Sequence, residues 1–142
     1  MNISTRFTVS LHILTLLASC PGDPLTSEYI AGSVNTNPVV VRRLLGVLRK
    51  AGIVSSRPGN TGGWELSVDP ARLTLAQVRT AVNDGSPFSM HSQPPNPHCP
   101  VGRNIQKALV SVYLRAEQAM EKELSRTTVE TLLRSVQNRN RA

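Results

Sequence analysis

The chain of 142 residues is 39% hydrophobic and carries a formal net charge of +7, which suits one folded core with an appendage and a phosphate-bearing partner. It has no apolar run of the roughly 20 residues that span a membrane and no signal-peptide pattern, so we expect a cytoplasmic protein. Two cysteines are too few for a disulfide framework, and two phenylalanines, two tyrosines and one tryptophan are too few to predict stacking on single-stranded nucleic acid.

Two helices are predicted first. Phe7, Leu11, Leu14 and Leu17 recur at helical spacing, and the turn residues that begin at Pro21 end that helix. Thr26 then caps a short helix through about Gly32. In helix-turn-helix proteins this second helix crosses the DNA backbone. Thr26 therefore has two open interpretations, a phosphate contact at the positive end of the helix or a plain cap.

A basic helix follows. Asn37 is a suitable N-cap, Pro38 suits the first helical position, and Gly52 is a suitable stop. The expected buried stripe consists of Val41, Leu44, Leu45 and Leu48. The other faces carry the expected DNA-binding residues Val39, Val40, Arg42, Arg43, Arg49 and Lys50. No acidic residue lies on this helix, so nothing on the helix itself neutralises its positive charge. Arginine can pair with guanine, and valine can contact the methyl group of thymine.

A hairpin is predicted after this helix. Residues 53–57 and 64–68 have strand character, and residues 58–63 have turn chemistry. Arg57 at the base and Asn60 and Thr61 at the tip are the expected DNA contacts, because small residues there allow the backbone to approach a phosphate or a minor groove. An amphipathic helix followed by an unrelated hairpin is the plain alternative. The order of the elements favours a winged helix-turn-helix that binds DNA.

The remaining chain is predicted to be helical except for one loop. Thr74 and Gln77 form a capping-box signature that starts a helix ending near Asn83. Residues 84–102 contain five prolines and form a loop. A helix over 103–124 would be roughly 33 Å long, and its apolar stripe needs a cover, for which a second copy is the simplest choice. The expected dimer interface is Ile105, Leu109, Val112, Ala116 and Met120. A last helix begins near Thr127, with Leu132, Leu133 and Val136 inward.

These elements predict a mainly α fold with a small β wing: a winged helix-turn-helix followed by a long C-terminal dimerisation helix. We divide the chain into a DNA-binding domain (1–83), a sensory or linker loop (84–102), and the dimerisation and terminal helices (103–142).

The chain resembles the Rrf-two family of winged-helix transcription regulators over almost its whole length. The resemblance is carried by the segments 4–18, 44–57, Gly62-Gly63-Trp64-Glu65-Leu66 and 73–78. It implies a homodimer joined through the long helix, with two recognition helices about 34 Å apart in successive major grooves. It also implies DNA contacts at Asn37, Val39, Val40, Arg42 and Arg43 and at the wing residues Arg57, Asn60 and Thr61. Most members repress transcription, and many sense redox state, nitric oxide or a cluster through cysteines in the loop before the long helix.

Cys99 is the only cysteine in this loop, where cluster-binding members of the family carry three. One thiolate cannot supply the four ligands of a [2Fe–2S] cluster, and His91, His98 and Cys99 fit no compact zinc motif. We therefore expect neither a cofactor nor a metal. The start of a helix, with His98 and Arg103 nearby, would stabilise a thiolate. Two interpretations stay open, a single-cysteine switch and an inert, half-buried thiol.

The sequence thus predicts a homodimeric, sequence-specific DNA-binding transcription regulator, more specifically a repressor, with an oxidant or a small molecule as effector. The alternative is a winged-helix module that binds protein without specific DNA readout, and the arginines of the basic helix argue against it. We expect no enzyme, because the chain has no paired carboxylates, no activated nucleophile and no phosphate-binding glycine loop.

Overall fold

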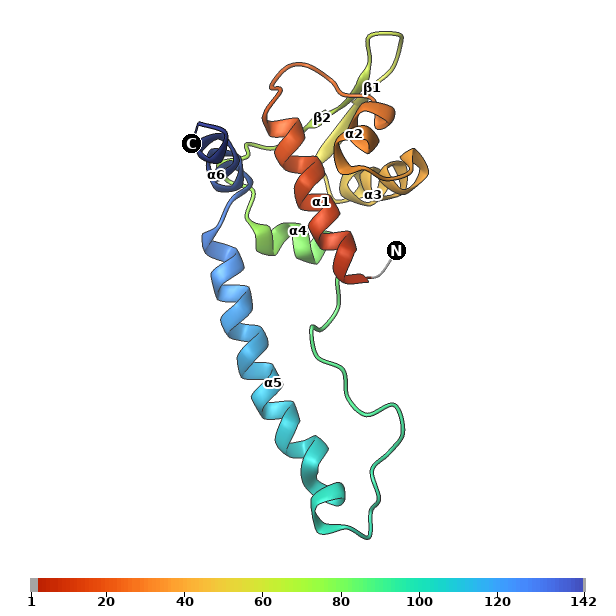
Figure 1. Cartoon of the computed structure of the whole chain (residues 1–142), viewed down its shortest axis with the longest axis vertical. Coiled ribbons are helices and arrows are strands. Elements are labelled where there is room, and N and C mark those ends of the chain that lie inside the picture. The colour runs from red at the N-terminus through yellow and green to blue at the C-terminus, as the bar shows by residue number, and fades with distance from the viewer. Residues whose placement is uncertain (1–2, 142) are drawn as a thin grey trace.

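The computed structural model describes residues 3–141, which form six helices and one two-stranded hairpin. The elements are α1 (Ile3–Ala18), α2 (Ser27–Val34), α3 (Pro38–Lys50), β1 (Val54–Arg57), β2 (Gly63–Leu66), α4 (Leu75–Val82), α5 (Pro100–Arg126) and α6 (Val129–Asn140). All of them except α5 gather into one body, which we call the head (residues 3–83 and 127–141), and α5 extends away from it (Figure 1). The predicted mainly α fold with a β wing is confirmed.

The core of the head is drawn from five helices and the hairpin. In α1, Leu14 and Leu17 of the predicted stripe are buried, whereas Phe7 and Leu11 are only half-buried. Helix α3 buries the four residues expected from the sequence. Because this stripe is covered inside the head, the opposite side of α3 is left free to face outward. The fully buried apolar side chains are Ile13, Leu14, Ile30, Val41, Leu44, Leu45, Leu48, Val54, Val78, Val82 and Val129.

The hairpin is antiparallel, with Val54 opposite Leu66 and Arg57 opposite Gly63. A third backbone segment joins it, because Leu25 and Trp64 exchange two backbone hydrogen bonds of 2.9 and 2.8 Å. A Cβ atom on Gly63 would lie 2.6 Å from the carbonyl oxygen of Leu25, and one on Gly62 would lie 2.1 Å from that of Arg57. The packing of the hairpin itself therefore requires a glycine at both positions.

Helix α4 begins with the predicted capping box. The amide of Gln77 donates to Thr74 Oγ1 over 3.2 Å, and the amide of Thr74 donates to Gln77 Oε1 over 2.9 Å. The chain returns to this point after α5, because the amide of Leu75 donates to the carbonyl oxygen of Thr127 over 2.9 Å. This return places α6 in the head.

Helix α6 packs on α1 and not along α5, with Val129 fully buried at its start. Leu132 and Leu133 are half-buried, as predicted. The prediction that Val136 faces inward is wrong, since its side chain is 47% exposed. It lies near the free end of α6, where the helix contributes to the edge of a surface hollow.

Helix α5 has 27 residues and is about 40 Å long at 1.5 Å per residue. It begins at Pro100 and ends at Arg126, so it is longer at both ends than the sequence predicted. Its C-terminal part lies on α4, where Arg79 and Glu121 form an ion pair of 3.5 Å. The loop before it runs beside it, and Phe88 stacks on Tyr113 with ring centroids 4.5 Å apart. No residue of α5 is buried within the single chain.

Candidate nucleic-acid interface

Helix α3 presents a continuous outward line of four residues, Val39, Arg43, Gly46 and Lys50. They follow one another at intervals of four, three and four positions and therefore share one side of the helix. This side lies opposite the buried stripe, and Val39, Arg43 and Lys50 are exposed. Among residues 3–141, neither Arg43 nor Lys50 forms an ion pair. Two cations thus face solvent without a neutralising partner, as a phosphate-rich ligand would require.

Arg42 differs from Arg43 although the two are adjacent in the sequence. Its Nη2 atom donates to Oε1 of Glu28 on α2 over 2.6 Å. A hydrogen bond from the backbone N–H of Glu28, together with the Arg42 guanidinium, holds the pKa of the Glu28 carboxyl below its usual value. As the sequence indicates, α3 itself carries no acid, and the acid that neutralises Arg42 comes from the neighbouring helix.

Two further arginines connect α3 and the hairpin to neighbouring side chains. The guanidinium of Arg49 lies 5.5 Å from the centroid of the Trp64 ring, within the range of a cation–π contact. Arg57 Nε donates to Glu65 Oε1 on the opposite strand over 3.0 Å. Arg49 therefore links the end of α3 to β2 of the hairpin. The Arg57 side chain is bound to the opposite strand of the same hairpin.

The side chains of the two predicted caps are engaged as caps. Thr26 Oγ1 accepts from the amide of Tyr29 over 3.1 Å, and Asn37 Oδ1 accepts from the amide of Val39 over 2.8 Å. A capping oxygen satisfies an otherwise unpaired amide of the first turn, and this role is sufficient to explain both residues. Asn60 and Thr61 lie exposed at the tip of the wing, and Val40 is half-buried beside the outward line.

The predicted dimer residues lie along one side of α5. Val112 is 47% exposed, and the other four residues are half-buried. Val101 extends the same stripe at 68% exposure. A 27-residue helix with an apolar stripe and no buried residue is not stabilised by its own chain alone. This surface is therefore suited to a protein partner and not to DNA.

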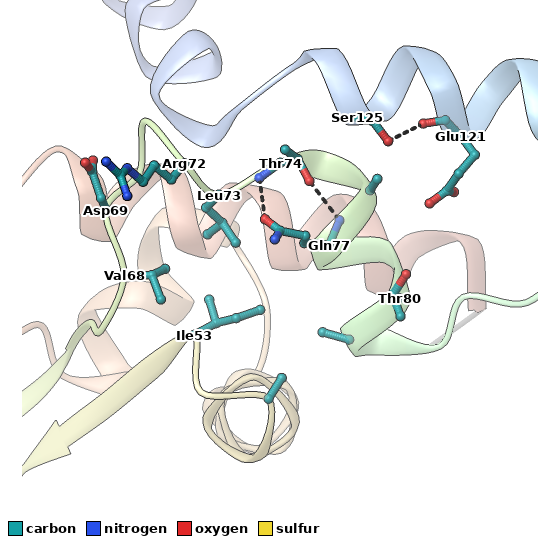
Figure 2. A pocket seen from close by; sticks show the side chains of 13 residues that line it. Ile53, Val68, Asp69, Arg72, Leu73, Thr74, Gln77, Thr80, Glu121 and Ser125 are labelled. Carbon is teal, nitrogen blue, oxygen red and sulfur yellow. Dashed lines mark hydrogen bonds between the residues drawn. The ribbon is translucent and has the colours of Figure 1, made fainter.

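A second feature is a hollow of about 1070 Å³ where α4 meets α5 (Figure 2). Its polar groups already stabilise the local structure. The capping box of α4 lies on one side, and on the other Ser125 Oγ donates to the carbonyl oxygen of Glu121 over 2.8 Å. Asp69 accepts from the amide of Ala71 over 2.9 Å. The hollow marks the joint between the head and α5.

Cys99 is exposed and precedes the first residue of α5 as its N-cap, without a side-chain capping bond. Cys20 is half-buried, close to the end of α1. Within residues 3–141, no three His, Cys, Asp or Glu side chains gather into a group that could hold a metal ion. The donor set of one chain therefore does not fit an iron–sulfur cluster, which takes four ligands. No helix in the described range is long and apolar enough to cross a bilayer.

The Rrf2 (Rrf-two) family model, described as an iron-dependent transcriptional regulator, matches residues 3–135. The chain belongs to the Rrf2 family. It is 42% identical over 132 residues to YwnA of Bacillus subtilis, a protein named as an HTH-type transcriptional regulator, and the match covers 92% of this chain and 96% of YwnA. The family resemblance inferred from the motifs is confirmed.

Two solved structures show that the likeness extends to the whole Rrf2 fold. One, described as a DNA-binding protein, is 39% identical, has a TM-score of 0.71, and covers 90% of this chain and 98% of its own. The other is CymR, the global cysteine regulator of Bacillus subtilis, with 26% identity, a TM-score of 0.73 and coverage of 95% and 98%. This Rrf2 protein is therefore related to transcription regulators along nearly its full length.

Three residues that shape the surface were not predicted from the sequence to contact the arginines, namely Glu28, Trp64 and Glu65. Each touches a predicted DNA-binding arginine from another element. Glu65 had an available signal, because it lies two positions beyond Gly63, the residue opposite Arg57, and such a diagonal neighbour is within reach of a long side chain. Glu28 and Arg42 are 14 positions apart, and no local pattern relates them.

Proposed function

We propose that this Rrf2 protein is a homodimeric, sequence-specific DNA-binding transcription repressor of the cytoplasm. The observation that carries the proposal is the outward line of α3, which presents unpaired cations beside the wing while the apolar stripe of the same helix is covered. A helix with this arrangement can enter the major groove, and the wing then lies against the backbone or the minor groove. The role is regulatory and not catalytic.

In this proposal each region of the chain has its own task. Residues 1–83 bind DNA, residues 84–102 form the sensory loop, and residues 103–142 join two copies. The apolar stripe of α5 supports the dimer, because an uncovered apolar surface of this length is costly in water. Two copies related by a two-fold axis would place two recognition helices about 34 Å apart, one turn of B-form DNA.

Fluorescence anisotropy tests the regulator directly. The full-length, reduced protein is titrated against the DNA immediately upstream of its own gene, with random duplex DNA as competitor. We expect specific binding that weakens steeply as salt rises, because cations that neutralise phosphates release counterions. Equal affinity for both DNAs, or no binding, would contradict sequence-specific regulation. Binding to protein without DNA readout would then be the better description.

We also propose that the effector acts through Cys99 as an oxidant or a thiol reagent. The exposure of Cys99 and its place where the loop meets the dimer helix support this role, since modification there would disturb the joint between two copies. The same anisotropy titration is repeated after oxidation, with Cys99→Ser and Cys20→Ser variants. Loss of the response only in Cys99→Ser supports the switch. Binding that is indifferent to oxidation would leave a small molecule as the effector.

Finally, we propose that the regulator works without an iron–sulfur cluster, although its family is described as iron-dependent. The proposal rests on the chemistry of the donors, because the loop before α5 brings a single thiol. Anaerobic purification followed by absorption spectroscopy and iron analysis tests it. We expect no visible thiolate-to-iron absorption band, and about two iron atoms per chain would contradict the proposal.

A further inference from the structure

The outward line of α3 begins with an apolar residue, although its neighbours on that line are cationic. The side chain of Val39 is 53% exposed in the first turn of the helix. Its exposure is not needed for the fold, because the buried stripe of α3 is complete without it. The only apolar group on the base edges of the major groove is the C5 methyl group of thymine. Val39 is therefore matched to thymine at the point where a recognition helix meets the bases.

Two polar groups near Val39 are already engaged within the chain. Asn37 uses its side-chain oxygen to cap the amide of Val39, and Arg42 is paired with Glu28. Arg43 is the nearest cation whose guanidinium has no ion-pair partner among the described residues. A free guanidinium on this side of the helix is suited to the O6 and N7 atoms of guanine.

The distance between these two residues limits the distance between the bases they contact. Val39 and Arg43 are four positions apart, which corresponds to about 6 Å along the helix axis. Successive bases on one strand are about 3.4 Å apart. The two bases are therefore expected within about two base pairs of each other in one half-site.

Gly46 is an independent sign that this side of α3 approaches DNA closely. A Cβ atom at this position would have no heavy atom within 4 Å outside its own helix, so packing does not require a glycine there. Its backbone is helical, and a glycine inside a helix costs roughly 1 kcal/mol relative to alanine. Gly46 leaves a gap on the outward line between Arg43 and Lys50, where a sugar–phosphate chain or a base edge can come close.

We infer that the half-site read by this protein contains a thymine and a guanine within about two base pairs, the thymine recognised through its methyl group by Val39 and the guanine by Arg43. This inference rests on the proposed function, and it names the DNA chemistry that the same surface selects. Val39 is a specificity-determining residue, because the methyl group is the only feature of thymine that it can distinguish.

The experiment first selects bound duplexes from a randomised pool with the full-length protein. Each thymine of the selected site is then replaced singly by deoxyuridine, which lacks only the methyl group, and affinity is measured by fluorescence anisotropy. We expect one replacement to weaken binding by about fourfold, the factor for burying one methyl group. Val39→Ala should be insensitive to that replacement. Val136→Ala, at the 47%-exposed valine of α6, serves as the matched control and should respond like the unchanged protein.

The guanine is tested by 7-deazaguanine, which lacks the N7 acceptor. We expect it to weaken binding by the unchanged protein and to have no further effect on Arg43→Ala. Circular dichroism confirms that both variants keep their fold. A selected site without thymine, or uracil replacements without effect, would overturn the inference while leaving the regulator intact. A pool in which no sequence is enriched would instead refute the proposed function.

Discussion

Helices α3 and α5 both expose one side that the chain does not cover, but the two sides differ in chemistry. Helix α3 buries its apolar stripe in the head and exposes cations, whereas α5 buries nothing and exposes Val101 and Val112 on its apolar stripe. A cationic surface without counter-charges is matched to a polyanion, and an apolar stripe is matched to another apolar surface. The same chain therefore carries two exposed surfaces of different chemistry, which the proposed function assigns to DNA and to a second copy of the chain.

The largest effect is expected from placing a charge on the apolar stripe of α5. Val112→Glu should separate the dimer, because a carboxylate cannot be buried between two apolar helices without a partner. A site with two half-sites should then bind about 100-fold more weakly or worse, since the second recognition helix is no longer linked. Sedimentation velocity gives the mass, and anisotropy gives the affinity.

Val110→Glu is the matched control for the α5 surface. Val110 is also exposed, at 53%, but two positions along a helix correspond to a rotation of about 200°, so it lies on the other side of α5. We expect this variant to remain dimeric. Dissociation by Val110→Glu and not by Val112→Glu would show that the interface lies on the opposite side of the helix.

The next effect concerns the two free cations of α3. Arg43→Ala should weaken specific binding by about 1–3 kcal/mol and reduce the preference for the operator over random DNA, as expected for a base contact. Lys50→Ala should weaken binding to both DNAs alike, as expected for a phosphate contact. Competition anisotropy with operator and random duplexes separates the two. An equal loss on both DNAs for Arg43→Ala would reduce its role to a phosphate contact.

Gly46→Ala should affect the fold and DNA binding in opposite directions. Alanine should raise the free energy of unfolding by up to about 1 kcal/mol, because it favours the helix and has room for its methyl group. The same methyl group should weaken DNA binding by filling the gap on the outward line. Thermal unfolding by circular dichroism and anisotropy measure the two effects. Unchanged affinity in a stabilised variant would show that DNA does not approach this point.

The smallest effect is expected at the ion pair between α2 and α3. Glu28→Gln should release Arg42 and strengthen binding to operator and random DNA alike. The affinity should also fall more steeply with salt concentration, by the amount expected for about one additional phosphate contact. The folded-state pKa of Glu28 is lowered, so its carboxylate stays ionised at neutral pH and the pair is lost only as the pH falls through that lowered pKa. Binding by the unchanged protein should therefore not depend on this group near neutral pH. A weaker affinity of Glu28→Gln would show that Glu28 orients Arg42 toward DNA.

Features that depend on neighbouring residues were predictable from the sequence. The caps at Thr26, Asn37 and Thr74, the buried stripe of α3 and the left-handed Gly52 after it all have local causes, namely unpaired amides, helical periodicity and backbone geometry. The family was also readable, because its motifs lie in short continuous segments. Once the periodicity had identified the buried side of α3, the residues on its outward side could be read from the sequence.

Other features depended on contacts between distant positions, and only the tertiary structure decided them. It paired Arg42 with Glu28, placed Arg49 over Trp64, added Leu25 to the hairpin and returned α6 to α1. An ion pair or a backbone bridge forms wherever the fold brings two groups together. The number of residues between the two groups does not predict that contact. The sequence thus determined which helix is basic and which of its sides is apolar, whereas the packing of the head determined that Arg42 is paired and Arg43 is not.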